Sequence, residues 1–384
     1  MSLIDARRLF QRSLSAAPDR LHFAAHSHHL WPDASYVGQI AAWDDAARLA
    51  DRKWDRVMGE LWPAAQHHVA HELGLSDPST IVFGSSTHEL IVRLASHLPR
   101  PLRLVMGEGE FHSMTRQAAR WEEAGEAIVT GIAAGPDLAA RVAQAARDAK
   151  AQLVVLSHVA FGTGAVVEDL SPLAEVAGDG VDAPIVVIDG YHGFMAIETD
   201  LSRYADRLCY VAGGYKYAMA GEGVSFLHVP HHIAPRPLLT GWYAAFDDLQ
   251  APSGVGFAPD ARRLLGATFD PSGLYRFVAV RDMLADEGLT TARITAHCDV
   301  LRRRLEEGTA ATALGQAERV NPDRNGANHA RFVAYRHPSA AAWSAALLER
   351  GVITDVRGDV LRVGLGLYQT EADLAALLKE LSRL

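Results

Sequence analysis

Cysteine is scarce in this sequence of 384 residues: only Cys209 and Cys298 are present, and they lie far apart. This excludes a disulfide-stapled secreted scaffold. No apolar run approaches the roughly 20 residues that a membrane-spanning helix needs, so no membrane partner is expected. The first 20 residues lack a continuous apolar region and a small-residue cleavage site. We therefore expect a cytoplasmic protein.

Basic residues are also outnumbered, with 37 Lys and Arg against 46 Asp and Glu and a formal net charge of −9. Non-specific nucleic-acid binding needs a basic surface, so this balance argues against a nucleic-acid partner. A hydrophobic content of 49% with 22% charged residues is typical of a globular protein. The length allows a large core and favours two domains.

Short apolar runs alternate with helix-like segments between Leu73 and Val229. Six runs resemble buried strands: STIVFGSS, PLRLVMGE, AQLVVLSHVA, APIVVIDGYHG, DRLCYVAGG and GVSFLHVP. Segments between them, such as HELIVRLASHL and PDLAARVAQAARDAK, have helical periodicity. This alternation predicts an α/β domain whose mainly parallel sheet is covered by helices.

The pattern changes in the C-terminal third. The stretch from Thr240 to Pro271 is rich in glycine, proline and aromatic residues and predicts a long crossing segment. Leu274–Leu305 then predicts one long helix, followed by the strands ARFVAYRH and DVLRVGLGLY and by the closing helix TEADLAALLKELSRL. We predict an N-terminal arm (1–40) that contributes to the small domain and the active site, a large domain (41–272) and a small C-terminal α+β domain (273–384).

Asp189 follows four apolar residues in IVVIDGYHG, which predicts a carboxylate at the tip of a central strand. A carboxylate in that place needs a partner. In a structural role it caps a helix or pairs with an arginine, and in a functional role it pairs with a cationic group of a ligand. His192, three residues later, is close enough to face the same cavity.

The stretch IVFGSSTHEL joins a strand to an amphipathic helix through small and hydroxyl residues. Free N–H groups and hydroxyls at a helix N-terminus can bind phosphate, which would involve Ser86 and Thr87. The structural alternative is that one of these residues caps the helix, with Glu89 completing the capping arrangement.

Lys216 ends a third apolar run, in the setting GGYKY. The default interpretation is that Lys216 is an exposed lysine in a loop without a functional role. In a confined apolar cavity, however, the ammonium form is disfavoured, which activates a lysine for Schiff-base formation. An anion loop, an aspartate at a strand end and a lysine at a strand end are the three parts that a pyridoxal phosphate enzyme requires.

Several motifs resemble kynureninase, within the class V aminotransferase group of fold-type-I pyridoxal phosphate enzymes. DGYH and GGYKY resemble its D-x-x-H and Y-K-Y elements, and LSHVAFGTGAVVEDL resembles its serine–histidine–valine segment. LTGWYAAF and LLGATFDPSGLY resemble its glycine–tryptophan and G-T segments, and GVITDVRGDVLRVGLGLYQT resembles its ending. LHFAAHSHHLWP is similar to a degenerate form of its N-terminal element, with His26, His28 and His29 at altered positions.

The resemblance implies the fold-type-I architecture: a large domain with a mainly parallel, seven-stranded type of sheet, and a smaller C-terminal α+β domain. It also implies pyridoxal 5′-phosphate as cofactor and an amino acid as substrate. Lys216 would bind the cofactor covalently and move the Cα proton, Asp189 would pair with the pyridinium, and His192 would support that end. The implied phosphate ligands are Ser86, Thr87 and Tyr215.

Other roles implied by the resemblance lie further from the lysine. His112 or Phe111 would stack on the cofactor ring, and we favour His112. Trp242 and Thr268 would reach the phosphate of the neighbouring subunit's cofactor, which implies a homodimer with shared active sites. The implied substrate-binding residues are Arg362, Ser27, His28 and Phe161, with Arg362 as a bidentate clamp for the substrate carboxylate. For Arg362 the structural alternative is a salt bridge on a strand face.

The implied reaction is hydrolysis of the Cβ–Cγ bond of kynurenine or a related amino acid, which releases an aryl acid and alanine. One alternative is a class V aminotransferase or lyase that acts on another small amino acid, and another is a non-catalytic binding protein with the same fold. A metal site at the His26–His29 cluster is not favoured, because no cysteine or paired acidic ligand accompanies it. A cysteine desulfurase is disfavoured because Cys298 lies in a helical pattern.

Overall fold

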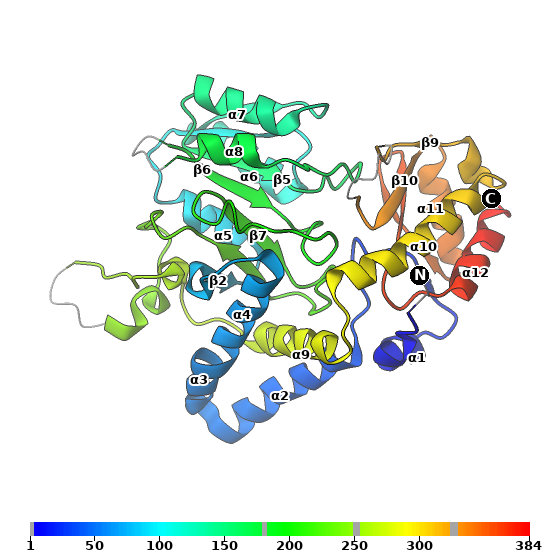
Figure 1. The fold of residues 1–384 in the computed structure, drawn as a ribbon, viewed down its shortest axis with the longest axis horizontal. Coiled ribbons are helices and arrows are strands. Elements are labelled where there is room, and N and C mark those ends of the chain that lie inside the picture. The colour runs from blue at the N-terminus through cyan, green and yellow to red at the C-terminus, as the bar shows by residue number, and fades with distance from the viewer. Residues whose placement is uncertain (1–3, 179–182, 249–253, 323–328) are drawn as a thin grey trace.

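The structure is a computed structural model, and it describes residues 4–178, 183–248, 254–322 and 329–384. Two bodies lie side by side in Figure 1, a larger one around a wide sheet and a smaller one around a narrow sheet. Both chain ends lie at the smaller body. Helix α10 (Thr291–Thr309), drawn in yellow, extends from the larger body along the smaller one.

The wide sheet has seven strands, in the spatial order β2-β8-β7-β6-β5-β3-β4. They are β2 (Ile81–Gly84), β3 (Leu102–Gly107), β4 (Ala127–Ile132), β5 (Leu153–Ser157), β6 (Ile185–Asp189), β7 (Cys209–Gly213) and β8 (Ser225–His228). Only β8 runs against its neighbours, and every other pairing in the sheet is parallel. The carboxyl ends of β5, β6 and β7 therefore meet at one edge, where open α/β sheets bind ligands.

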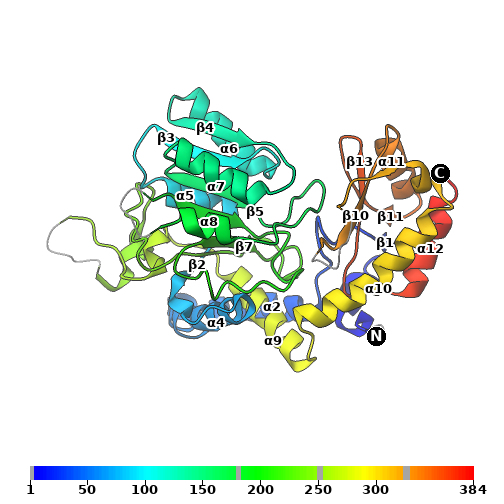
Figure 2. The ribbon, with the colours of Figure 1, turned by 45° about the horizontal axis from the view of Figure 1, so that its top comes forward.

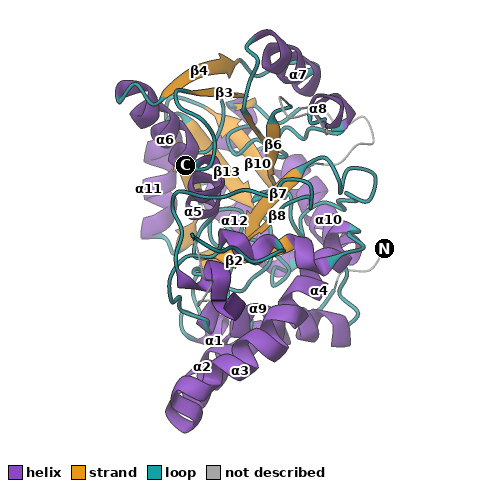
Figure 3. Ribbon diagram, turned by 90° about the vertical axis from the view of Figure 1, so that its left-hand side faces the viewer, coloured by secondary structure: helices purple, strands orange, loops and turns teal. Residues whose placement is uncertain are grey.

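Helices cover both faces of this sheet (Figure 2). Those that connect the strands are α5 (Thr87–Ala95), α6 (His112–Glu123), α7 (Leu138–Asp148) and α8 (Ser171–Val176). Of these, α5 and α6 cover one face, and α7 and α8 cover the other (Figure 3). The helices α2 (Asp33–Leu49), α3 (Lys53–Arg56), α4 (Trp62–Leu73) and α9 (Ser272–Asp286) pack together beside the sheet, with α4 against β2. In α7 the spacing of Ala139, Val142, Ala143 and Ala146 buries one stripe against the sheet, as the periodicity predicts. Among the described residues, no helix is both long and apolar enough to cross a membrane.

The smaller body contains an antiparallel sheet in the order β12-β13-β10-β9. Its strands are β9 (Glu318–Arg319), β10 (Phe332–Arg336), β12 (Asp355–Arg357) and β13 (Val360–Gly364), and its helices besides α10 are α11 (Ala340–Glu349) and α12 (Glu371–Leu381). The N-terminal segment joins this body, because β1 (Leu21–His22) pairs with β11 (Val352–Ile353) after the short helix α1 (Gln11–Ser15). Figure 3 shows the strands of both sheets in orange among the purple helices.

The predicted helix Leu274–Leu305 is wrong as a single element, because the structure divides it into α9 and α10. The chain turns at Gly288, whose φ of 59° is left-handed, and Thr290 then caps α10 by accepting a hydrogen bond from the N–H of Arg293. Glycine reverses the chain here at little conformational cost, and threonine is a favoured N-cap.

The crossing segment predicted between Thr240 and Pro271 contains 3₁₀ turns at Trp242–Asp248, which are interrupted by the non-helical Ala245, and a short 3₁₀ helix at Ala261–Leu264. Part of that prediction lies outside the described residues. The edge strand β4 was not predicted. Its residues are mostly half-buried or exposed, so they form no continuous apolar run.

Candidate active site

Lys216 lies in the turn after β7 and is only 5% exposed. Its ammonium nitrogen Nζ is 2.7 Å from Nε2 of His192. The ring centroids of Tyr191, Phe111 and Tyr215 lie 4.8, 5.6 and 5.8 Å from the same nitrogen. Burial lowers the pKa of Lys216 to about 7, although the charge of Asp189 opposes this shift. The exposed-loop reading is therefore wrong, and a substantial fraction of this lysine is uncharged near neutral pH.

His192 accepts the hydrogen bond from Lys216 as a neutral ring. Burial first, and then the charge of Lys216, lower the pKa of His192 well below its ordinary value. A neutral ring that accepts at Nε2 has its proton on Nδ1, and that buried atom has no hydrogen-bond partner among the residues that the structure describes. His192 thus has a free donor beside Lys216.

Asp189 ends the buried strand β6, as predicted. Its Oδ1 accepts a hydrogen bond of 2.9 Å from the backbone N–H of Tyr191. Burial raises the pKa of Asp189, while that hydrogen bond and the charge of Lys216 oppose the rise. The next residue is Gly190, where a Cβ would lie 2.0 Å from the hydroxyl oxygen of Tyr210. Glycine is needed there so that the buried Tyr210 ring can pack beneath the strand end.

The anion loop precedes α5. Ser86 is the N-cap, and its hydroxyl accepts a hydrogen bond of 3.2 Å from the N–H of Glu89. The carboxylate of Glu89 turns back to Ser85 and also lies 2.6 Å from Arg93, which offsets its charge. The capping alternative is therefore present in the structure, together with the helix N-terminus that phosphate binding needs.

One cavity of about 310 Å³ joins these features. Its lining includes the predicted residues Ser86, Thr87, Phe161, Asp189, His192, Tyr215 and Lys216, together with Phe111. A helix N-terminus, a carboxylate, a buried lysine and aromatic walls thus surround one space. Nδ1 of His192 adds a hydrogen-bond donor that no described residue engages. These residues fit the cofactor that the sequence resemblance implies.

Phe111, rather than His112, faces this cavity. Phe111 lines it, whereas His112 begins α6, is exposed and contacts Phe161 with a centroid distance of 5.2 Å. The first residue of a helix that starts at the rim points along the surface, while the residue before it turns inward. The geometry favours the phenylalanine as the ring that stacks on a ligand.

Arg362 lies behind the cavity wall, on β13, and is 3% exposed. One end of its guanidinium contacts Asp355, its cross-strand partner, and the other donates to the carbonyl oxygen of Phe161. Its buried Nε has no hydrogen-bond partner within the described part of the chain. Although burial opposes it, His26 and Arg362 hold the pKa of Asp355 at about 2. The salt bridge between Arg362 of β13 and Asp355 of β12 is therefore formed, and Nε is the guanidinium donor that no described residue engages.

The N-terminal residues lie at the rim of the cavity. Nδ1 of His28 is 3.2 Å from a carboxylate oxygen of Glu222, and its ring stacks on Tyr215 with a centroid distance of 6.1 Å. Both Glu222 and Tyr215 line the cavity, although His28 and its neighbour Ser27 do not. His26 is fully buried and stacks on Phe332 at 4.7 Å. No cluster of three or more metal-ligating side chains occurs in the described part of the chain.

Trp242 and Thr268 lie away from this cavity, on an exposed face. The indole N–H of Trp242 donates a hydrogen bond of 3.2 Å to the hydroxyl of Thr268, and Trp242 is 44% exposed. The two residues are thus brought together, but not next to Lys216 of their own chain.

Comparison with known proteins agrees with this geometry. Residues 291–381 match the kynureninase C-terminal domain family. A kynureninase of Deinococcus radiodurans is 29% identical over 243 residues, covering 60% of this chain and 57% of that protein. Isopenicillin N epimerase of Streptomyces clavuligerus is 26% identical over 375 residues, covering 88% of this chain and 89% of that protein.

Solved structures of two enzymes superpose over almost the whole chain. A cystine C–S lyase in complex with cysteine persulfide gives a TM-score of 0.80 at 17% identity, covering 96% of this chain and 99% of that one. The cysteine desulfurase CsdA of Escherichia coli gives 0.78 at 17% identity, covering 100% and 98%. The chain has the class V, fold-type-I pyridoxal phosphate enzyme fold. The predicted fold class, the resemblance to this group, and the prediction of an enzyme that uses this cofactor are confirmed.

The residues near the site that were not predicted include Glu110, Ser157, Tyr191 and Asp355. Ser157 and Tyr191 line the cavity, Glu110 binds Ser157, and Asp355 binds Arg362. Tyr191 lies between Asp189 and His192, so its position in the motif was a usable signal. The other three come next to the site through strand pairing and loop packing, which no local pattern reveals.

The turn after Lys216 lies in the stretch AMAGEG. It contains three left-handed residues, Met219, Gly221 and Gly223, with φ of 57°, 76° and 84°. Arg276 of α9 donates a hydrogen bond of 2.7 Å to the carbonyl oxygen of Ala220 and also contacts the carbonyl of Glu222. These contacts fix the turn against the large domain.

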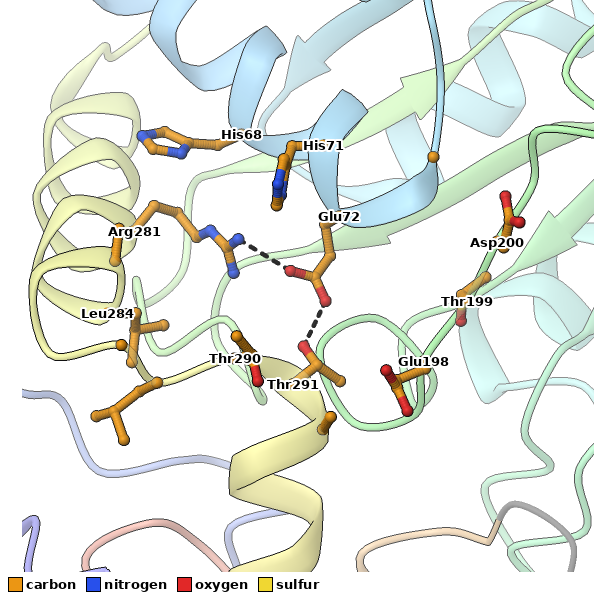
Figure 4. A pocket seen from close by; sticks show the side chains of 15 residues that line it. His68, His71, Glu72, Glu198, Thr199, Asp200, Arg281, Leu284, Thr290 and Thr291 are labelled. Atoms are coloured by element: carbon orange, nitrogen blue, oxygen red, sulfur yellow. Dashed lines mark hydrogen bonds and ion pairs between the residues drawn. The ribbon is translucent and has the colours of Figure 1, made fainter.

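A second, larger cavity of about 580 Å³ lies between the ends of α4 and α9 and the start of α10 (Figure 4). Glu72 reaches across it, with one carboxylate oxygen 2.9 Å from Arg281 and the other bound to the hydroxyl of Thr291. None of the predicted site residues lines it. Glu72 thereby ties the start of α10 to the large body.

Proposed function

We propose that this protein is a pyridoxal phosphate-dependent hydrolase that cleaves the Cβ–Cγ bond of kynurenine or a closely related amino acid. The observation that carries the proposal is the buried Lys216, which lies between His192 and aromatic rings in a cavity that also holds Asp189. The match of residues 291–381 to the kynureninase C-terminal domain supports this choice of reaction.

The bound cofactor supplies an aldehyde that reacts with amines and a ring that accepts electrons. Lys216 would hold that aldehyde, because its lowered pKa leaves a nucleophilic amine near neutral pH. The same nitrogen Nζ would take the proton from the substrate Cα. His192 accepts a hydrogen bond from Nζ and thereby orients it.

Three other parts of the chain would place the cofactor and the substrate. Asp189 would hold a protonated ring nitrogen, because its carboxylate is fixed at the strand end by Tyr191. Phe111 would stack on the ring, while the N-terminus of α5, with Ser86 and Thr87, would hold the phosphate. Arg362 would bind the substrate carboxylate in a bidentate pair, through the buried Nε that has no partner among the described residues and through a second guanidinium donor released from Asp355.

A class V aminotransferase or lyase that acts on another small amino acid is the second candidate. The match to an epimerase over 88% of the chain supports this wider reading. The desulfurase reaction is less well supported, because both cysteines of the chain are buried and neither lies at the cavity. A non-catalytic protein would not need Lys216 and Asp189 together.

Incubation with kynurenine tests the reaction. The cofactor-loaded protein should release fluorescent anthranilate and alanine in equal amounts, because hydrolysis yields one of each. Transfer of the amino group to pyruvate or 2-oxoglutarate would instead favour the aminotransferase. If a cofactor-loaded protein neither releases anthranilate and alanine nor transfers the amino group, both candidate reactions are contradicted for kynurenine as substrate.

Replacing Arg362 by lysine is expected to raise KM about 10–100-fold with kcat changed only severalfold. Lysine keeps the charge but cannot form the bidentate pair, and a hydrogen bond to a charged group contributes about 1.5–3 kcal/mol. Steady-state kinetics would measure this split. Arg336→Lys on the neighbouring strand β10, whose side chain is 44% exposed, is the matched control. A large fall in kcat at unchanged KM would contradict the clamp.

The active sites of a homodimer would be shared, with Trp242 and Thr268 reaching the partner's cofactor. Trp242 and three apolar residues near it in the sequence are exposed: Leu238 at 81%, Leu239 at 51%, Trp242 at 44% and Phe246 at 41%. Apolar groups of this kind that gather on a surface mark an interface. Thr268 is exposed beside them and bound to Trp242.

Co-expression of two inactive variants, Lys216→Ala and Trp242→Ala, should restore activity. Each mixed dimer then contains one site with both residues intact, so about a quarter of all sites should work if subunits pair at random. The activity of the mixture would be compared with that of each variant alone. Mixed dimers that form but stay as inactive as the two parents would show that the sites are not shared in this way.

A further inference from the structure

Glu110 is a buried acid that has no role in the chemistry described above. It lies in the loop between β3 and α6, directly before Phe111, and it is 4% exposed. A buried carboxylate normally requires a cation or several donors. Here both carboxyl oxygens contact a single residue, Ser157 of β5. Oε1 accepts the backbone N–H of Ser157 at 2.9 Å, and Oε2 lies 2.5 Å from its hydroxyl oxygen.

The surroundings of Glu110 contain no compensating positive charge in the described part of the chain. The single charged group that acts on it is Asp189, at the end of β6, and that charge is of the same sign. The strands packed against it contribute Gly107 and Leu156 besides Ser157, and none of these ionises. Burial first raises the pKa of Glu110, with a small contribution from Asp189, and although the two hydrogen bonds from Ser157 oppose this rise, the pKa reaches about 8.

An uncharged Glu110 has one proton, and its geometry limits where that proton lies. Oε1 already accepts an N–H, so the proton belongs to Oε2, which then donates to the hydroxyl oxygen of Ser157. The distance of 2.5 Å fits such an O–H···O bond. The hydrogen of the Ser157 hydroxyl is then free to point elsewhere.

The active-site cavity is a direction available to this hydrogen. Ser157 lines the active-site cavity and lies directly beside Asp189, because the two residues are paired in register at the ends of β5 and β6. Neighbouring strands are about 4.8 Å apart, and paired residues project from the same face of the sheet. A hydroxyl hydrogen that points into the cavity therefore lies at the Asp189 end.

We propose that Glu110 is a positioning residue that turns the Ser157 hydroxyl into the cavity as a hydrogen-bond donor at the Asp189 end. A donor there favours the charged carboxylate of Asp189, which the proposed function needs to hold the ring nitrogen. When Glu110 ionises, the hydroxyl turns back to donate to it, and a second negative charge lies near Asp189. The role toward the cofactor rests on the proposed function, whereas the hydrogen bond between Glu110 and Ser157 does not.

The first experiment measures denaturant unfolding of the cofactor-free protein between pH 5 and 9, for the wild type and Glu110→Gln. Because the folded pKa of Glu110 is raised, its protonated form stabilises the fold. That stability is complete below the ordinary glutamate pKa and is lost as the pH rises through about 8. The wild type should therefore lose stability relative to Glu110→Gln by up to about tenfold in the unfolding constant per pH unit. The exposed control Glu349→Gln should follow the wild type.

The second experiment measures the affinity for added pyridoxal phosphate at pH 7 and 9. Glutamine donates to the Ser157 hydroxyl at every pH, so Glu110→Gln should bind the cofactor severalfold more tightly than the wild type at pH 9, with little difference at pH 7. In a Ser157→Ala background that advantage should disappear, because the positioned hydroxyl is absent. A merely structural glutamate would not give this coupled, pH-dependent pattern.

The two experiments fail in different ways. The same pH dependence of unfolding in the wild type and Glu110→Gln would overturn the inference, even if the cofactor binds. An equal advantage of Glu110→Gln with and without Ser157 would also overturn it, since the effect would then come from charge alone. Failure of every variant to bind pyridoxal phosphate, with the unfolding difference intact, would overturn the proposed function and leave the bond between Glu110 and Ser157 standing.

Discussion

Replacing Lys216 by alanine is expected to lower turnover at least about a thousandfold, because one nitrogen both holds the cofactor and moves the substrate proton. The protein should still fold and bind pyridoxal phosphate without a covalent bond. Removing a buried amine whose charged form is already disfavoured leaves no unpaired charge behind. His192 would lose its hydrogen-bond donor, which costs about 1 kcal/mol of stability.

The chain offers a matched control for this variant. It contains only four lysines, and Lys379 on α12 is exposed and distant from the cavity. Lys379→Ala should keep wild-type turnover, and both variants should have wild-type circular dichroism. A folded Lys216→Ala protein that retains more than about a tenth of the activity would contradict the assigned role of the lysine.

Replacing Asp189 by asparagine is expected to lower kcat about a hundredfold while the cofactor still attaches to Lys216. Asparagine has the same shape and can still accept the N–H of Tyr191, so the strand end keeps its geometry. Only the negative charge is lost. Without it, a protonated ring nitrogen in a site with little water loses a few kcal/mol of electrostatic support.

The measurement combines kinetics with an absorption spectrum of the loaded protein. Asp282→Asn, whose side chain is 59% exposed on α9, is the control. A loaded Asp189→Asn protein with wild-type kcat would show that the ring does not depend on this carboxylate. Loss of cofactor attachment at neutral pH would show instead that Asp189 acts mainly on Lys216.

The sequence predicted the architecture well where burial is complete. β5, β6 and β7 are apolar on both faces, and each of the six predicted runs is a strand of the wide sheet. β4 was missed because an edge strand covered on one side has no such run. The break between α9 and α10 was missed because one left-handed glycine interrupts an apolar pattern that continues on both sides.

The main residues of the candidate active site were also predictable, because they follow buried strands. Lys216, Asp189 and Ser86 each follow an apolar strand, and parallel strands bring their carboxyl ends together. The sequence does not specify which of two adjacent side chains at the start of a helix faces the cavity. His112 was therefore preferred, although Phe111 faces the cavity in the structure. The contacts of Arg362 with Asp355 and of Glu110 with Ser157 depend on register between strands and on loop packing. Residue order alone does not specify either.

The central claim is that Lys216 binds pyridoxal phosphate covalently. Purified protein would be loaded with the cofactor at about pH 7.5, near the pKa of the lysine, reduced with borohydride, digested and analysed by mass spectrometry. The account predicts one reduced cofactor per chain on the peptide that contains Lys216, and none in Lys216→Ala. A protein that takes up no cofactor, or one labelled instead at Lys53, Lys150 or Lys379, would contradict it.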